Sequence, residues 1–248
     1  RRRDPSAYHI RAVSPPGGDF FLHQKYDSLA AYANLGFQVN DKFRIAAGLR
    51  QTEDDKSADT EPVVGVIGAS NSNDGSEITW DVSASYKFAD RLTFYGAVQS
   101  GYQAGQYPAR PFCLFGNPNC FAATENVTAI NYEVGLKGEI FDNLQLSIAV
   151  FNTNYKDLPY QVSTTTGAGF NTQSIVVDQT SRGAELETTW AATDNFRLHA
   201  TVGYIDADVD DPNPAAVAPL TPELTMSLSP ELTIPTGSGE ITLRADWS

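Results

Sequence analysis

The stretch ITWDVSASYKFADRLTFYGAV, residues 78–98, decides the fold class of this chain. From Ile78 to Phe88 every second residue is apolar, and the residues between them are polar. Such alternation is typical of a β-strand with one apolar face and one polar face. Ala89-Asp90 interrupts the pattern, and alternation resumes at Leu92. Two alternating runs joined by a short polar turn predict an antiparallel hairpin.

Similar runs recur along most of the chain, in the same two-residue period. Ten segments share it: 28–40, 43–49, 78–88, 92–102, 130–140, 144–150, 184–190, 196–204, 224–232 and 241–247. A repeated period of two over so many segments indicates strands much more strongly than any single run. The sequence therefore predicts an all-β, antiparallel protein of about ten strands.

The connections between these segments alternate between short and long. Short polar turns occur at Asn40-Asp41, Ala89-Asp90, Asp142-Asn143, Thr193-Asp194 and Pro235–Gly239, and long polar connections at 53–75, 104–127, 157–172 and 207–220. One end of the predicted sheet thus has tight hairpins and the other end has long loops. Outer-membrane β-barrels show this asymmetry, with short periplasmic turns and long extracellular loops.

Aromatic residues on the apolar face form two groups. One group lies a few residues from the short turns and comprises Phe37, Phe43, Phe88, Phe94, Trp190 and Phe196. The other lies toward the long connections and comprises Trp80, Tyr102, Tyr132 and Tyr204. Two aromatic belts with smaller aliphatic residues between them match the girdles of a membrane-spanning barrel.

The alternation changes phase once. Ile175 and Val177 are odd-numbered, whereas the apolar residues from Ala184 to Trp190 are even-numbered. Either a β-bulge between them or a stretch that projects beyond the bilayer explains the change.

Composition excludes several classes of protein. With 17 Lys and Arg against 30 Asp and Glu, the net charge of −13 argues against a nucleic-acid partner. Apolar residues make up 41% of the chain and charged residues 19%, which excludes a disordered chain. The longest apolar run, Val63–Ala69, is far too short for a spanning helix. The polar start at Arg1–Pro5 shows no signal peptide, so we expect a processed chain or a piece of a longer one.

Several strings resemble the barrel of TonB-dependent outer-membrane receptors, and they occur in the order usual for that family. These strings are AGLR at 47–50, YGAVQSGYQAG at 95–105, NYEVGLK at 131–137 with FNTNYKD at 151–157, SRGAELE at 181–187, and Thr221-Pro222 at a strand opening. None is specific alone, but five in order over roughly residues 28–248 are fairly specific.

The resemblance implies a bacterial outer-membrane transporter that captures a scarce nutrient, most often an iron–siderophore complex. Its uptake would be driven by the TonB complex, its partners would be outer-membrane lipid and its own plug domain, and no catalysis or bound cofactor is implied. The family's plug and TonB box are not found here, and its barrels have 22 strands. We therefore expect residues 28–248 to be a partial barrel, and residues 1–27 to be the remnant of an extracellular loop.

The two faces of the predicted strands differ in chemistry. We expect lipid contact from Leu35, Ala47, Val82, Val134, Ile148 and Leu198, and lumen-facing side chains at Asn34, Arg44, Arg50, Asp81, Lys87, Glu133, Lys137, Glu139, Glu185, Glu187, Arg197 and Arg244. A lumen wall with both charges suits hydrogen bonding to a plug, whereas a charge-selective pore favours one sign.

Few residues point to site chemistry. Cys113 and Cys120 flank Gly116-Asn117-Pro118, which predicts a disulfide across a small loop, with a pair of free thiols as the alternative. The three histidines, His9, His23 and His199, lack a recognisable nucleophile partner, so we expect no catalytic site and no metal site.

Two other functions stay open at this stage. The chain would be a complete ten-stranded outer-membrane barrel, acting as a surface protease or adhesin, if its first and last strands pair. It would be a soluble β-sandwich binding module if the Leu29–Val39 face packs on a second sheet. The sequence does not identify the transported ligand or the loop residues that contact it.

Overall fold

The computed structural model describes residues 7–14, 18–60, 70–107, 123–166, 169–210 and 221–248. Within these residues the chain forms eleven β-strands. Their bounds are β1 Ala7–Ser14, β2 Gly18–Gln38, β3 Phe43–Thr60, β4 Ser70–Ala89, β5 Leu92–Gln103, β6 Val127–Ile140, β7 Leu144–Thr166, β8 Gly169–Thr193, β9 Phe196–Asp210, β10 Leu224–Thr236 and β11 Gly239–Arg244. This part of the chain holds no helix that would cross a membrane.

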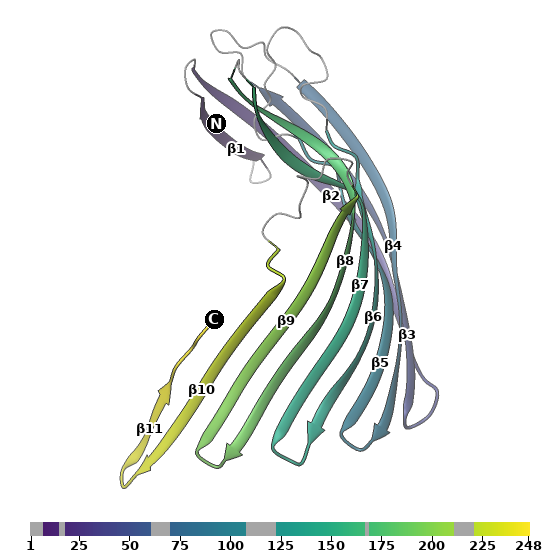
Figure 1. Cartoon of the computed structure of the whole chain (residues 1–248). Helices are drawn as coiled ribbons and strands as arrows, with labels where there is room; N and C mark the ends of the chain where they lie inside the picture. Colours follow the sequence, from purple (N-terminus) through teal and green to yellow (C-terminus); the bar gives the residue numbers. More distant parts are fainter. Residues whose placement is uncertain (1–6, 15–17, 61–69, 108–122, 167–168, 211–220) are drawn as a thin grey trace.

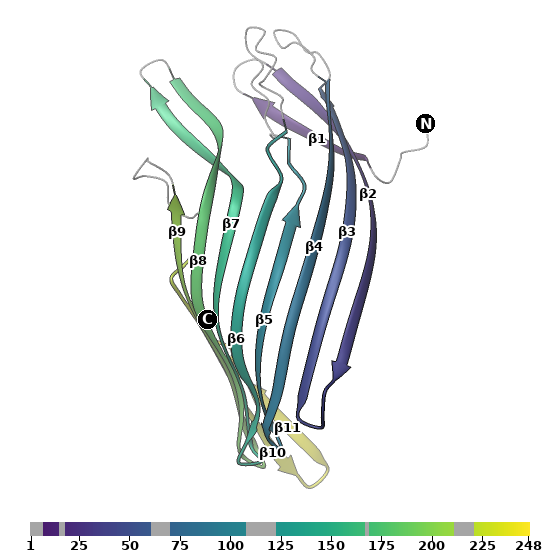
Figure 2. The same cartoon turned by 90° about the vertical axis from the view of Figure 1, so that its right-hand side faces the viewer.

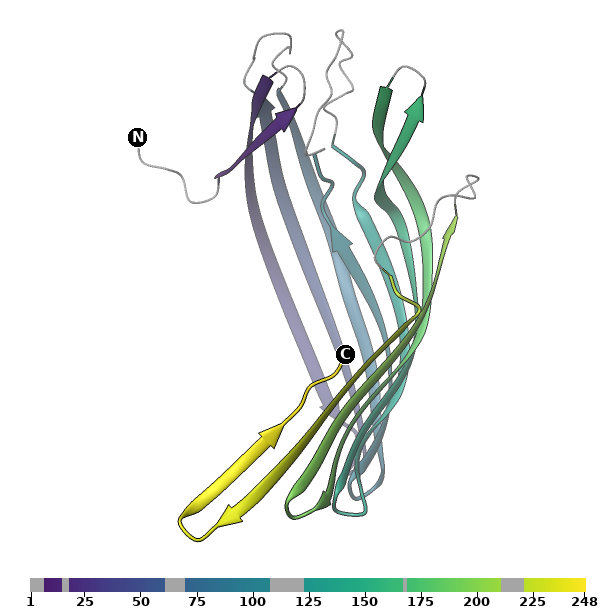
Figure 3. The same cartoon turned by 60° about the vertical axis from the view of Figure 1, so that its left-hand side comes forward.

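The strands form one antiparallel sheet in which each strand pairs with its neighbours in the sequence, from β1 to β11. The sheet is strongly curved, like part of the wall of a cylinder (Figures 1 and 3). Among the described residues, β1 and β11 lie at opposite edges and do not pair with each other. The described residues therefore form neither a closed ten-stranded barrel nor a sandwich of two sheets.

The ten predicted strands are confirmed as β2 to β11. The five predicted short turns connect β2 to β3, β4 to β5, β6 to β7, β8 to β9 and β10 to β11, all at the same end of the sheet (Figure 2). The asymmetry between the two ends, inferred from connection lengths, is thus present in the structure.

Two expectations about strand extent were wrong. The prediction missed β1, and residues 18–27, expected in a loop, form the first half of β2. Much of the predicted connections 53–75, 157–172 and 207–220 is also strand. Glu53–Thr60 and Ser70–Gly75 carry no hydrophobic alternation, yet their backbone groups continue the hydrogen-bonded ladder. β11 ends at Arg244, and Trp247 then bridges Leu228.

Curvature distinguishes the two faces of the sheet. Side chains crowd together on a concave face and diverge on a convex one. Along β4, Ile78, Trp80 and Val82 are exposed, whereas the odd-numbered residues between them are half-buried. The apolar set thus occupies the convex outer face, and the polar set lines the concave inner face. The same division into two faces continues across β2, β3 and β4. Leu35 pairs with Ala47 and Ala47 pairs with Val82, so these apolar residues lie on one face.

The phase change near Val177 has a structural explanation. Strand β8 pairs with β9 without interruption from Asp178 to Ala191, so no bulge separates Val177 from Ala184. The irregularity lies in β7 between Tyr155 and Leu158, where Asp157 has a φ of 58°. Val177 is buried in the hairpin of β7 and β8, which rises above the neighbouring strands β6 and β9 (Figure 2). The projecting stretch, rather than a bulge in β8, is correct.

The strands rise to different heights at the end with long connections. Strands β3 and β4 pair from Phe43↔Tyr86 up to Asp59↔Ser70. Pairing between β4 and β5 stops at Asp81↔Gln99, and β5 ends well below the tip of β4 (Figure 2). The wall is therefore tall at β2–β4 and at β7–β8, and low at β5–β6.

Candidate functional site: the inner wall

The inner wall at mid-height carries polar side chains of both signs. A shallow depression of about 390 Å³ is lined on this face by side chains that include Asn34, Arg50, Asp81 and Gln99. Asn34 Oδ1 and Asp81 Oδ1 lie 2.4 and 2.2 Å from the place where a Cβ on Gly48 would be, so both side chains lean over that glycine. This wall presents acceptors and a guanidinium to whatever fills the lumen.

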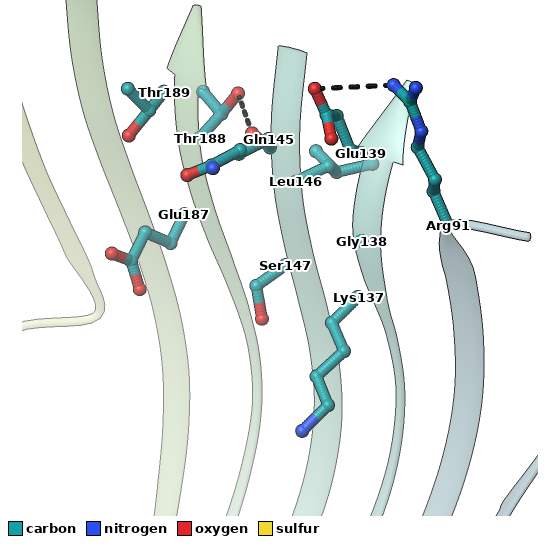
Figure 4. A pocket seen from close by; sticks show the side chains of 10 residues that line it. All are labelled: Arg91, Lys137, Gly138, Glu139, Gln145, Leu146, Ser147, Glu187, Thr188 and Thr189. Carbon is teal, nitrogen blue, oxygen red and sulfur yellow. Dashed lines mark hydrogen bonds and ion pairs between the residues drawn. The ribbon is translucent and has the colours of Figure 1, made fainter. Parts of the chain in front are cut away.

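A second depression, of about 450 Å³, lies toward the short turns. Lys137, Ser147 and Glu187 project into it from the neighbouring strands β6, β7 and β8 (Figure 4). At its rim, Arg91 forms an ion pair with Glu139 at 3.6 Å (Figure 4). Arg91 also forms an ion pair with Asp142. The lower wall thus offers an ammonium on β6 and a carboxylate on β8, with β7 between them.

Tyr95 lies flat on the inner wall. Its hydroxyl donates a 2.7 Å hydrogen bond to Glu133 Oε1, and Lys137 Nζ lies 5.3 Å from the centre of its ring. The ring covers Gly135, where a Cβ would lie only 2.5 Å from the ring carbons. Glycine at this position is what allows the ring to lie against the backbone.

The most buried polar groups of the described residues lie higher on the inner wall. Tyr26 Oη donates a 2.7 Å hydrogen bond to Asp54 Oδ1, and Asp54 is only 3% exposed. The Tyr102 hydroxyl is buried beside Asp54 but makes no hydrogen bond of regular geometry. It crosses Gly75, where a Cβ would lie 2.8 Å away. Tyr102 was predicted in the outer aromatic belt, and that prediction was wrong because the end of β5 turns inward.

Lys56 holds this inward turn in place. Its ammonium donates to the carbonyl oxygens of Ala104 and Gly105 at 3.0 and 2.9 Å, and it lies 4.9 Å from the centre of the Tyr26 ring. Gly105 N–H donates to Asn126 Oδ1 at 2.9 Å. We refer to Tyr26, Asp54, Lys56, Tyr102 and the segment Ala104–Tyr107 as the mouth cluster.

The mouth cluster lies beyond the membrane-spanning part of the strands. A spanning strand uses about 9–11 residues, which, counted from the short turns, takes β4 to the level of Trp80. Burial disfavours the charge of Asp54, but hydrogen bonds from Ser28 and Tyr26, the neighbouring Tyr102 hydroxyl and the Lys56 charge outweigh it, so the pKa of Asp54 is lowered. Burial lowers the pKa of Lys56, and Asp54 opposes that shift. The cluster is thus an internal hydrogen-bonded support of the rim.

A smaller polar cluster occupies the inner side of the β7–β8 hairpin. Gln179 accepts a hydrogen bond from the Tyr160 hydroxyl and donates to Ser181 Oγ at 2.8 Å. Gln179 and Ser181 are buried, and so is Val177. The two tall parts of the wall are therefore both packed on their inner sides above the membrane level.

The predicted site residues are only partly covered by the structure. Cys113 and Cys120 lie outside the described residues, so the disulfide stays a prediction. The predicted division into an apolar and a polar face is confirmed, with Leu35 78% and Val134 51% exposed on the outer face. Sequence reasoning missed the mouth cluster, because all its residues except Tyr102 fall in stretches expected to be loops, and Tyr102 was assigned to the outer face. The sequence signal for this cluster was the presence of a tyrosine, an aspartate and a lysine at Tyr26, Asp54 and Lys56. These residues become neighbours only through the register of β2 and β3.

Comparison with known families identifies the class of this sheet. Residues 1–245 match the model of the TonB dependent receptor-like β-barrel. The chain belongs to that family, and its sheet is part of a bacterial outer-membrane barrel.

Curated relatives include the pesticin receptor of Yersinia pestis, which is 30% identical over 172 residues. The pesticin receptor of Yersinia enterocolitica is 28% identical over 167 residues. In both cases the match covers 66% of this chain and 24% of the relative. The chain thus spans about a quarter of the length of the curated relatives it matches.

Solved structures share the fold. The ferric yersiniabactin uptake receptor FyuA from Yersinia pestis superposes with a TM-score of 0.75 at 21% identity, over 92% of this chain and 34% of that chain. The copper transporter OprC superposes with a TM-score of 0.66 at 19% identity, over 86% of this chain and 33% of that chain. At these identities the likeness concerns the fold alone.

Proposed function

We propose that this sheet is part of the wall of a TonB-dependent receptor that takes up a scarce nutrient, with a ferric siderophore as the cargo. The observation that carries the proposal is the two-faced wall of a family member. Its apolar outer face suits lipid, and its inner face carries both charges, with Arg50 on β3 and Asp81 on the adjacent β4. Relatives described as a pesticin receptor and a ferric yersiniabactin uptake receptor support receptor and uptake functions.

We also propose partners for the free edges of the sheet and for its lumen. Eleven strands are half the number in a plugged 22-stranded transporter barrel. We propose that further strands join the free edges of β1 and β11, and that a plug domain fills the lumen against Asp81, Glu133 and Glu187. Coupling to the TonB complex would run through parts of the protein other than this sheet. The wall itself supplies binding surface and no catalysis.

Deletion of the gene in the native bacterium tests the proposal. Uptake of ⁵⁵Fe-loaded phenolate, catecholate and hydroxamate siderophores is measured in iron-starved cells, with and without a protonophore. We expect uptake of one class to be lost on deletion, restored by the intact gene and abolished by the protonophore. Unchanged uptake of every class in the deletion strain would exclude the siderophore proposal.

A further inference from the structure

The upper part of β4 has an open edge inside the sheet, away from both ends of the chain. From Ser70 to Thr79, β4 pairs with β3 on one side only, because pairing with β5 stops at Asp81↔Gln99. In Figure 2 the upper half of β4 rises above the end of β5. An unpaired strand edge offers a row of N–H and C=O groups to any extended chain that reaches it.

Hydrogen-bond directions show which groups point to this edge. Trp80 N–H donates to Ser100 Oγ at 2.7 Å, and that hydroxyl donates to the Trp80 carbonyl at 3.2 Å, so Trp80 faces β5. Lys87 N–H, seven residues away, donates to the Lys42 carbonyl on the β3 side. Because directions alternate along a strand and the β3–β4 register is unbroken, the even-numbered residues face the open edge. These residues are Ser72, Asp74, Ser76 and Ile78.

Among the described residues, no strand pairs with this edge. Beyond Ser100 the end of β5 is held on the inner face of β3 and β4 by the Lys56 hydrogen bonds to Ala104 and Gly105. Gly105 lies against the Asn73 side chain, on the inner face of β4 rather than beside it. No backbone hydrogen bond from the described residues reaches Ser72, Asp74, Ser76 or Ile78 from the β5 side.

The edge also lacks the usual protection. Edge strands are commonly blocked by proline or lysine, and the upper part of β7 carries Pro159, but Ser70–Thr79 contains neither residue. Its surroundings are acidic, with Asp74 and Glu77 on β4 and Glu53, Asp55 and Asp59 on the adjoining β3. The one lysine there, Lys56, is already bonded to backbone carbonyls.

We propose that the upper edge of β4 is a docking edge for an extended, basic segment of a polypeptide partner on the cell exterior. The partner would add a strand to Ser70–Thr79, as in other cases of β-strand addition. Backbone groups of the four even-numbered residues would supply affinity, and the surrounding carboxylates would favour lysine or arginine side chains. The inference rests on the outer-membrane placement and not on the identity of the cargo.

A proline scan of the edge tests the proposal. Ser76→Pro removes an N–H that faces the open edge and leaves the β3–β4 ladder intact, whereas Ser76→Ala retains that N–H. The probe is a fluorescent ten-residue peptide of alternating threonine and lysine, titrated onto the full-length protein in outer-membrane vesicles. We expect binding to weaken at least tenfold in Ser76→Pro, to be unchanged in Ser76→Ala, and to be at least tenfold weaker for a threonine–glutamate peptide.

Hydrogen exchange on the unmodified protein gives an independent readout. The lysine peptide should slow exchange at Ser72, Asp74, Ser76 and Ile78, while the odd-numbered amides, already bonded to β3, stay unchanged. Equal peptide binding by Ser76→Pro and wild type, or slowing without this alternation, would overturn the proposal. Siderophore uptake should be the same in Ser76→Pro and wild type, so failure of this inference is distinguishable from failure of the uptake function.

Discussion

The outer and inner faces of this sheet share one backbone but differ in what stabilises them. On the outer face Leu35, Val82 and Val134 are exposed to the surroundings and touch little of the protein, so their stability comes from lipid. On the inner face Asp54 is almost fully enclosed by its own chain. The difference shows that the surroundings of a side chain decide what stabilises it. At membrane level the outer side chains are stabilised by hydrocarbon, and at the rim the inner side chains are stabilised by polar contacts within the protein.

The largest effect is expected from a charge on the outer face. Val134→Arg places a guanidinium at mid-height in hydrocarbon and should destabilise the inserted barrel by about 2–4 kcal/mol. Asn131→Arg, on the inner face of the same strand, is the matched control and should cost little. Urea unfolding of the full-length protein in lipid vesicles measures both, and equal destabilisation by the two variants would contradict the assignment of faces.

Two neighbouring aspartates sharpen the comparison at the rim. Asp54→Ala removes the acceptor of the Tyr26 hydrogen bond and removes the negative charge near the half-buried Lys56. It should cost about 1–3 kcal/mol of local stability. Asp55→Ala, on the exposed outer face, should change stability by less than about 0.5 kcal/mol. The rate of amide hydrogen exchange at Ala104–Tyr107 measures the effect of each variant. Equal exchange rates in the two variants would contradict the role of the mouth cluster in supporting the rim.

A glycine pair tests how closely side chains lie on the inner wall. In Gly135→Ala the new methyl meets the Tyr95 ring, so the ring must lift and lose its bond to Glu133, at a cost of about 1 kcal/mol. In Gly101→Ala the nearest atom is 3.6 Å away, and no loss is expected. Tyrosine fluorescence and thermal unfolding of the two variants separate these outcomes, and similar behaviour would argue against the ring lying on Gly135.

Acid should weaken the rim before the membrane-level wall. The pKa of Asp54 is lowered below 3.8, so its contribution is complete above that pH and is lost as the pH falls through the lowered value. Exchange at Ala104–Tyr107 should therefore accelerate in strongly acidic buffer in wild type. Asp54→Asn should show no such acceleration, and a pH response that persists in this variant would point to another group.

The sequence predicted the structure well where the outer side chains contact lipid, and poorly where they contact water. Ten strands, their faces and the short turns followed from alternation, because hydrocarbon on one side forces apolar residues such as Val82 and Val134 into phase. Glu53–Thr60 and Ser70–Gly75 were expected as loops, because water on the outside of the rim imposes no such pattern. Tyr102 was misplaced for a related reason: its inward turn depends on Lys56, 46 positions earlier in the chain, and on the missing side chain of Gly75. The cysteines remain untested.

The unequal heights of the strands have a mechanical consequence. A hydrogen-bonded ladder stiffens a sheet against bending, and at membrane level the ladder connects every strand from β2 to β11. Above Asp81↔Gln99 it is interrupted between β4 and β5, so the rim consists of separate plates rising from a common base. Bending of the β2–β4 plate does not pass to the β7–β8 plate through backbone bonds at that height. The distance between the two plates is therefore set by the groups that pack between them, and not by backbone hydrogen bonds.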